Sequence, residues 1–160
     1  MTDPQAQTAP SLAIERIYVK DLSLENPGAP QSLLQMTNAP HVEVGLRTRG
    51  EQIDQNLFES VLTITVTAKS GDKTLFLVEA AQGGVFRISG IPLSEIQPVL
   101  AIHCPNVLFP YARETIADAI TRAGYPPVHL DPINFEMLYQ QQVASMQQPQ
   151  QPQPQVAAQA

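Results

Sequence analysis

The pair of side chains best suited to nucleophilic chemistry in this 160-residue sequence is Cys104 with its neighbour His103. A thiol becomes a strong nucleophile when a base lies within hydrogen-bond reach of it. Successive residues on a helix, however, point about 100° apart, so His103 cannot serve Cys104 without help from another element. A buried structural thiol is the simpler interpretation. A small hydrolase that uses Cys104 is kept as the third-ranked alternative.

Metal and phosphate sites are not indicated either. The histidines His41, His103 and His129 fall in separate segments, without the spacing of metal ligands on one element. Gln82-Gly83-Gly84 lacks the Lys-Ser or Lys-Thr of a phosphate-binding loop. We therefore expect no cofactor and no metal. The two glycines are assigned to backbone geometry, as a bulge or sharp bend in a strand.

The carboxylates Asp21, Glu25 and Glu79 lie in segments with strand-like alternation. A catalytic role would need burial or mutual repulsion to raise the pKa of one of them, and no neighbouring feature of the sequence indicates an enclosed pocket. The residue pattern alone therefore favours a solvated sheet face. The chain as a whole has the character of a binding protein and not of an enzyme.

Composition restricts the partners and the compartment. Fifteen acidic residues against 9 basic ones give a net charge of −6, which argues against nucleic acid and anionic membranes and favours a basic partner. Cys104 is the only cysteine, so no intrachain disulfide can form, as is usual in a reducing cytoplasm. No window approaches the ~20 apolar residues of a membrane span, and the N-terminus lacks a secretion signal. We expect a cytoplasmic protein without membrane insertion.

Four runs alternate with the two-residue period of half-buried strands. The clearest run is 58–69, which a Ser70-Gly71-Asp72-Lys73 turn joins to the run 74–82. Consecutive strands joined by turns predict an antiparallel sheet of four strands. The apolar faces are expected to comprise Leu12, Ile14, Tyr18, Leu22 and Leu24, then Val42, Val44 and Leu46, then Phe58, Leu62, Ile64, Val66 and Ala68, and finally Phe76, Val78 and Ala80.

Helical periodicity follows the strands. A short helix is predicted over 94–103, where Pro105 ends it, and a longer one after an N-cap at Asn106, with Gly124 at its end. Asp131-Pro132 is expected to cap a third helix. The apolar stripe of the long helix comprises Leu108, Ala112, Ile116, Ala119, Ile120 and Ala123. Strands first and helices last predict an α+β fold, with the C-terminal helices packed on one face of the sheet.

The two ends differ in composition from the rest of the chain. Residues 1–11 are small and polar and contain proline, whereas 141–160 are dominated by glutamine and proline. Such segments bury too little apolar surface to fold, so both are expected to be disordered. One domain is predicted between them, over 12–140.

Four segments of this domain resemble one known family. They are 16–21 (Arg-Ile-Tyr-Val-Lys-Asp), 81–84 (Ala-Gln-Gly-Gly), 86–91 (Phe-Arg-Ile-Ser-Gly-Ile) and 103–114, which opens His-Cys-Pro-Asn. Together they resemble SecB, the bacterial chaperone that holds secretory precursors unfolded before export. The resemblance runs from about Ile14 to about Tyr139. It implies a homotetramer, built as a dimer of dimers, that binds unfolded preproteins and delivers them to the translocation ATPase SecA.

The resemblance also implies three sets of site residues. The acidic face that docks the basic C-terminal segment of SecA matches Asp21, Glu25, Leu77 and Glu79. The client groove is expected to be lined by Leu22, Leu24, Met36, Val42, Phe86, Phe109, Tyr111, Pro127 and Val128. Surface between chains is expected at Phe76, Val78, Ala80, Ala112, Ala119 and Ala123. The family often carries a tryptophan near Asn38, and this chain has none.

The sequence thus predicts a cytoplasmic, ATP-independent holding chaperone of protein export. The second-ranked alternative is a SecB-like chaperone dedicated to a single client, such as an antitoxin.

Overall fold

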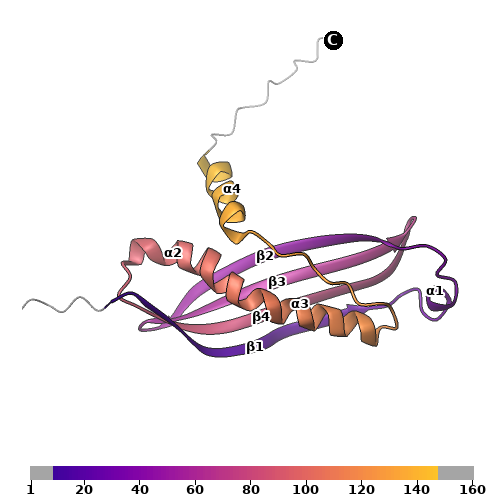
Figure 1. Ribbon diagram of the computed structural model, residues 1–160, viewed down its shortest axis with the longest axis horizontal. Coiled ribbons are helices and arrows are strands. Elements are labelled where there is room, and N and C mark those ends of the chain that lie inside the picture. The colour runs from indigo at the N-terminus through magenta and orange to yellow at the C-terminus, as the bar shows by residue number, and fades with distance from the viewer. Residues whose placement is uncertain (1–8, 148–160) are drawn as a thin grey trace, which may run out of the picture.

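The computed structural model describes residues 9–147. One antiparallel sheet of four strands carries the long helical run on one face, which confirms the predicted α+β class (Figure 1). The strands are β1 (Ser11–Glu25), β2 (His41–Asp54), β3 (Leu57–Ser70) and β4 (Lys73–Ser89). The helical elements are α1 (Gln31–Leu34), η1 (Leu93–Glu95), α2 (Ile96–Pro98), η2 (Val99–His103), α3 (Cys104–Arg122) and α4 (Phe135–Gln147).

The strands are arranged in the order β1-β4-β3-β2, so β1 and β2 form the two edges of the sheet. We call the side covered by α3 the helix face and the other side the outer face. The predicted alternation of β3 and β4 is confirmed, and the turn between them contains Gly71 with a φ of 59°. The helix face of these strands carries the buried side chains Leu62, Ile64, Val66, Ala68, Phe76, Val78 and Ala80.

The face assignment of β1 is corrected by its register. Two register shifts interrupt this strand, one after Ile14 and one after Val19. Alternation is inverted between them, so Ile17 and Val19 turn to the helix face while Tyr18 turns to the outer face and bonds Glu59. The prediction that Tyr18 shares the apolar side of the strand is therefore wrong. A bulge adds one residue to one strand only, and the hydrophobic pattern of that strand does not mark where it occurs.

The paired glycines of β4 serve close packing. A Cβ on Gly83 would lie 2.5 Å from Cε2 of Tyr18, and one on Gly84 would lie 2.7 Å from Cε2 of Phe86 and 2.9 Å from Cδ2 of Leu108. Strand β4 runs through both residues without interruption, so the predicted bulge or bend at this point is wrong. The glycines instead admit an aromatic ring on the outer face and the helix on the other.

Helix α3 supplies the second layer of the core and packs across β3 and β4. The predicted stripe is confirmed, because Leu108, Ala112, Ile116, Ala119, Ile120 and Ala123 are all buried. Gly124 follows the helix with a φ of 93°, in the left-handed region that favours glycine at a helix end. The apolar side of this helix thus fixes its position on the sheet.

The helical run is continuous from Leu93 to Arg122, contrary to the predicted break at Pro105 and new N-cap at Asn106. Proline removes one backbone donor, and its ring clashes with the preceding turn of an ordinary α-helix. The wider π-helical turn of η2 (Val99–His103) comes directly before Pro105 and accommodates both effects, so the chain does not have to leave the helix.

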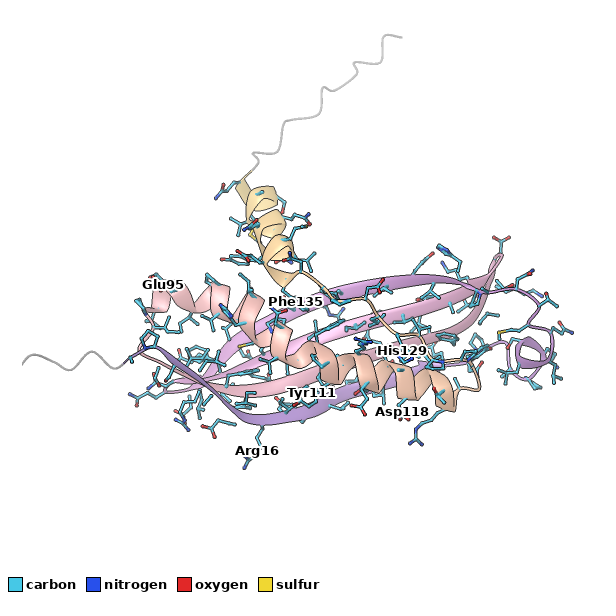
Figure 2. All side chains as sticks on the ribbon, in the orientation of Figure 1. Arg16, Glu95, Tyr111, Asp118, His129 and Phe135 are labelled. Carbon is cyan, nitrogen blue, oxygen red and sulfur yellow. The ribbon has the colours of Figure 1, made fainter. Side chains whose placement is uncertain are left out.

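Helix α4 begins at Phe135, four residues after the predicted cap, because Asn134 and not Asp131 accepts the backbone N–H of Met137 at 2.9 Å. Figure 2 shows Phe135 at the base of α4, where the helix leaves the sheet. The helix continues to Gln147, so 141–147 belong to it and not to the expected disordered tail. The expectations for 1–8 and 148–160 fall outside the described residues.

Candidate functional site

The helix face contains an apolar groove next to the edge strand β2. Its volume is about 420 Å³. Phe76 and Tyr125 form its floor, with ring centroids 4.9 Å apart. One wall is the segment 36–40 and the other is 126–128, and Val42 of β2 adds to the lining. The groove is therefore built from the β1–β2 connection and from the start of the segment that links α3 to α4.

Four of the nine residues predicted to line a groove meet here, namely Met36, Val42, Pro127 and Val128. The other five do not line it. Phe86 and Phe109 are buried in the core, Tyr111 is exposed on α3, and Leu22 and Leu24 are exposed on the helix face of the other edge strand. Asn38, the position aligned with the family's tryptophan, does line the groove.

Sequence reasoning missed the floor of the groove. Phe76 was expected between chains, and Tyr125 was not singled out, although it lies between Gly124 and two prolines. An aromatic residue between a helix-ending glycine and Pro126-Pro127 is held close to the helix end, since each proline fixes its own φ and restricts the residue before it. The Gly-Tyr-Pro-Pro pattern alone could have indicated that Tyr125 packs against the end of the helix.

A second hollow, of about 280 Å³, lies behind the wall formed by the β1–β2 connection. It is lined by Gly28, Gln31, Ser32, Gln35, Ser70, Lys73, Thr74 and Leu75, and it shares Met36, Thr37 and Asn38 with the apolar groove. The segment 36–38 thus has a hollow on each side. It is a thin wall and not part of the packed core.

The predicted acidic positions lie close together on the outer face. Across the β1–β4 pair, Glu25 is directly opposite Leu77, Ser23 is opposite Glu79, and Asp21 is one outer-face position further along. Glu79 accepts a hydrogen bond from the Thr65 hydroxyl at 2.7 Å. We call Asp21, Glu25, Leu77 and Glu79 the acidic patch.

The carboxylates of this patch differ in their partners. Arg47 of β2 approaches Glu79 at 3.7 Å, whereas Asp21 and Glu25 are exposed and form no ion pair within residues 9–147. Two carboxylates without a counter-charge, next to the apolar Leu77, favour a ligand with positive charge and some apolar surface. The register of β1 and β4 places the patch on the face opposite the groove.

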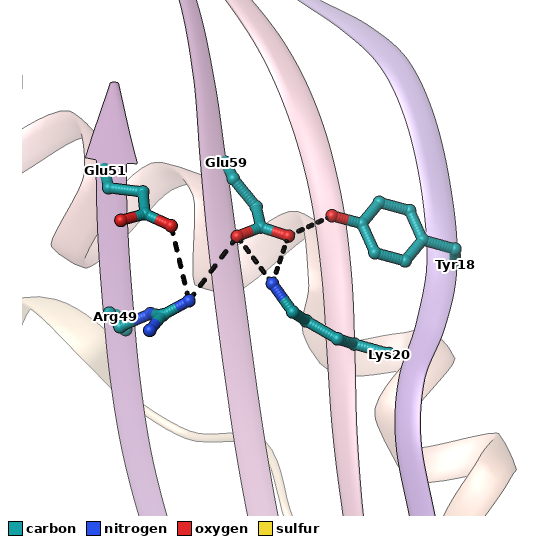
Figure 3. A network of polar contacts seen from close by, with 5 residues as sticks. All are labelled: Tyr18, Lys20, Arg49, Glu51 and Glu59. Carbon is teal, nitrogen blue, oxygen red and sulfur yellow. Dashed lines mark hydrogen bonds and ion pairs between the residues drawn. The ribbon is translucent and has the colours of Figure 1, made fainter. Parts of the chain in front are cut away.

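A polar network adjoins the patch on the outer face (Figure 3). Glu59 of β3 accepts hydrogen bonds from Tyr18 and from Lys20, whose Nζ lies 2.7 and 2.8 Å from the two carboxylate oxygens. Arg49 lies 3.6 Å from Glu59 and 3.3 Å from Glu51. The hydrogen bonds from Lys20 and Tyr18 hold the pKa of Glu59 below its ordinary value. Burial, with the hydrogen bond to Glu59, raises the pKa of Tyr18 to about 12.

The candidate chemical groups are placed unfavourably for catalysis. Cys104 is fully buried, and burial raises the pKa of its thiol to about 12, so the thiolate is not formed near neutral pH. His103 beside it is exposed. Within the described residues, no three His, Cys, Asp or Glu side chains are grouped so that they could hold a metal ion. Over the same residues, no helix is both long and apolar enough to cross a membrane.

The six residues predicted to lie between chains are buried within the single chain. Phe76, Val78, Ala80, Ala112, Ala119 and Ala123 are all 7% exposed or less, because α3 covers this part of the sheet. None of these six side chains is therefore accessible on the surface of the single chain. The helix face of β1 is exposed instead, with Leu12, Ile14, Val19, Leu22 and Leu24 between 37% and 50% accessible.

Comparison with known proteins decides the family. The family model described as preprotein translocase subunit SecB matches residues 5–146. The chain belongs to the SecB family. The SecB-type protein-export protein of Nitrosomonas eutropha is 53% identical, covering 95% of this chain and 96% of that protein. Its counterparts in Chromobacterium violaceum (52% identical, 88% of this chain, 93% of that protein) and Nitrosospira multiformis (54%, 88% and 87%) are similarly close.

A solved structure supports the fold independently. A SecB-like chaperone of Mycobacterium tuberculosis, in complex with a ChAD peptide from an antitoxin, superposes with a TM-score of 0.65. The match covers 76% of this chain and 90% of that one at 15% sequence identity, a level that supports the fold alone. SecB is a family of protein-export chaperones and not of enzymes.

Proposed function

We propose that this chain captures unfolded secretory preproteins in the apolar groove and keeps them competent for translocation. The groove carries the proposal, because its lining is apolar and aromatic, its volume of about 420 Å³ admits several side chains, and no catalytic group lies in it. Unfolded precursors expose the apolar side chains that such a groove binds. The family, shared with export proteins at 52–54% identity, supports the same conclusion.

The mechanism is capture without chemistry. Burial of ~1,000 Å² of apolar client surface, at ~25 cal/mol per Å², gives a gross stabilisation of ~25 kcal/mol, most of which is lost in ordering both partners. Binding is then tight but reversible. It requires no nucleotide, and a long client that occupies several grooves at once gains affinity from multivalency.

The second part of the proposal concerns delivery. The acidic patch binds the basic C-terminal segment of SecA, and Asp21 and Glu25 supply most of the attraction because Glu79 already has Arg47 and Thr65 as partners. Since the patch and the groove lie on opposite faces of one sheet, a client and SecA can be bound at the same time. The proposal assigns the chain to the cytoplasm, where precursors and SecA meet.

The third part is a homotetramer that forms as a dimer of dimers. The exposed apolar row of the edge strand β1 supports a second copy as its occupant, since a 15-residue edge strand with such a row is otherwise liable to aggregate. Four chains of 17.5 kDa give 4 × 17.5 = 70 kDa. Four charges of −6 give 4 × −6 = −24, which keeps the assembly soluble.

The alternative is a chaperone dedicated to one client, for which the M. tuberculosis structure with its antitoxin peptide is the supporting observation. Its sequence identity of 15% is far below that of the export proteins, so the general export function is preferred. A dedicated chaperone binds one unfolded protein and ignores others, which a panel of unrelated unfolded proteins distinguishes.

The test uses an unfolded secretory precursor and the isolated protein. We expect the protein to suppress precursor aggregation at a stoichiometry near one precursor per 70 kDa particle, equally with and without ATP. Light scattering follows the aggregation and also gives the particle mass. Continued aggregation at a several-fold excess of chaperone, or release of the precursor on addition of ATP, contradicts the proposal.

A further inference from the structure

A chain of hydrogen bonds fastens the β1–β2 connection to the end of α3. The Ser32 hydroxyl lies 2.6 Å from that of Tyr125, which donates to Oδ1 of Asn26 at 3.2 Å. Asn26 in turn donates through Nδ2 to the backbone carbonyl of Ala123 at 2.9 Å. Asn26 directly follows β1, and Ser32 lies in α1. We call Asn26, Ser32 and Tyr125 the clamp.

Apolar contact strengthens the clamp. Tyr125 is 4% exposed, and its ring packs against that of Phe76 at an interplanar angle of 46°, which limits the movement of its hydroxyl. A Cβ on Gly124 would lie 3.1 Å from Cδ2 of Leu33, which shows how closely α1 approaches the helix end. In Figure 1, α1 and the C-terminal end of α3 lie at the same end of the sheet.

The clamp lies at one end of the groove wall formed by residues 36–40. The segment 36–40 lies between α1 and β2, is largely exposed, and forms no hydrogen bond with the rest of residues 9–147. Hollows of about 420 and 280 Å³ lie on its two sides, so no close packing opposes a movement of 36–38 in either direction. The position of this wall is therefore set by its attachments.

We propose that the clamp, through the Tyr125 hydroxyl, fixes the width of the apolar groove and thereby its selectivity among client side chains. This inference rests on the proposed function of the groove. Asn26, Ser32 and the Tyr125 hydroxyl are positioning residues, because they hold the wall without having to touch a client. A fixed wall fits small aliphatic side chains closely, whereas a loosened wall must be ordered again around them. Large aromatic side chains fill the widened groove, so their binding loses less affinity when the wall is loosened.

The test measures the affinity of the full-length protein for two unstructured peptides of equal length and charge. One presents Val and Ala as its apolar residues, and the other presents Trp and Phe. Tyr125→Phe keeps the ring on Phe76 but removes the central hydroxyl of the clamp. Tyr139→Phe is the matched control, since the Tyr139 hydroxyl forms no hydrogen bond to the described residues.

Tyr125→Phe removes the hydrogen bonds of Tyr125 to Ser32 and Asn26. We expect it to weaken binding of the aliphatic peptide about three- to tenfold and binding of the aromatic peptide less than about twofold. Ser32→Ala should act in the same direction but less strongly, because the Tyr125 hydroxyl keeps Asn26. The double variant should equal Tyr125→Phe alone, since the Ser32 hydroxyl has then already lost its partner. Tyr139→Phe should leave both affinities unchanged.

Three outcomes overturn the inference. The first is an unchanged affinity for both peptides in all clamp variants, and the second is the same change in Tyr139→Phe. The third is equal weakening of both peptides together with a lower unfolding temperature, which marks a purely structural clamp. Failure of the proposed function looks different, because the wild-type protein then binds neither peptide.

Discussion

At the scale of single residues, the outer face is organised around one carboxylate. Glu59 is 8% exposed and is approached by Tyr18, Lys20 and Arg49 from the two flanking sides of the sheet. A buried carboxylate is stable only when donors replace its water, and here strands β1 and β2 both supply them. Because these strands are the edges of the sheet, the network ties the edges to the central strand β3.

The first prediction concerns the pH dependence of this network. Glu59→Gln should lower the free energy of unfolding by about 1.5–3 kcal/mol at pH 7, the range of hydrogen bonds to a charged group. The folded-state pKa of Glu59 is lowered, so its stabilisation is present above the unfolded pKa near 4.5 and lost as pH falls through the folded value. Urea titrations should thus show the two proteins converging as pH falls below 4.5. A difference that persists unchanged at pH 3 contradicts this account.

Tyr18 determines how the stability of the same network changes at alkaline pH. Its folded-state pKa of about 12 lies above the ordinary value of 10.0 for tyrosine, so deprotonation is harder in the folded state. Stability should therefore decline as pH rises from 10 towards 12. Tyr18→Phe is the control, because it removes this titration and should flatten the alkaline decline.

At the scale of elements, regular periodicity was predictable from the sequence and interruptions were not. The four strands, the turn at Gly71 and the buried stripe of α3 follow from alternation and helical spacing, each of which extends over many residues. The bulges of β1, the π-helical turn before Pro105 and the cap at Asn134 each depend on one residue and its tertiary neighbours. A local pattern contains no information about such neighbours.

The same difference decides which site residues were predictable. The acidic patch came together because strand register alone brings Glu25 next to Leu77 and Ser23 next to Glu79. The lining of the groove was predicted only in part, because its floor depends on how the chain returns to the sheet after α3. Tyr125 reaches Phe76 through that return, which no periodicity describes.

The second prediction concerns how α4 is attached. Phe135 is the buried residue of this helix and packs edge-on against Phe109, with ring centroids 6.2 Å apart. Phe135→Ala should lower the free energy of unfolding by about 3 kcal/mol, as for other large-to-small core substitutions. Met137 is 54% exposed, so Met137→Ala should change the free energy of unfolding by less than about 0.5 kcal/mol.

Chemical denaturation followed by circular dichroism measures both variants under the same conditions. Equal losses of unfolding free energy in the two variants would show that α4 is attached along its whole length. No loss in Phe135→Ala would show that α4 is not attached through Phe135. Neither result agrees with the burial pattern of this helix.

At the scale of the whole molecule, one sheet separates two surfaces of different character. The helix face carries an apolar groove beside β2, and the outer face carries an acidic patch beside β1. The hydrogen-bonded backbone of four strands lies between them, so a change in side chain on one face need not alter the other. Such an arrangement allows a client to be held and transferred by separate contacts.

The third prediction tests that separation with a pair of substitutions. Glu25→Lys should weaken binding of a basic SecA C-terminal peptide at least tenfold and leave capture of an unfolded precursor unchanged. Val128→Asp should do the reverse, because it introduces an unpaired charge into an apolar lining. Glu114→Lys makes the same charge change at an exposed position of α3 and serves as the control.

Salt provides the second readout of the same experiment. Contacts between exposed charges act largely through the association rate and are screened above about 0.15 M salt, where the Debye length falls below about 8 Å. Peptide binding by the wild-type protein should therefore weaken steeply with ionic strength, whereas precursor capture, driven by apolar burial, should hold or strengthen. The residual peptide binding of Glu25→Lys should depend less on salt than that of the wild type, because one attractive charge has been lost. Parallel loss of both activities in Glu25→Lys, with an intact particle mass, would show that the two faces do not function as separate sites.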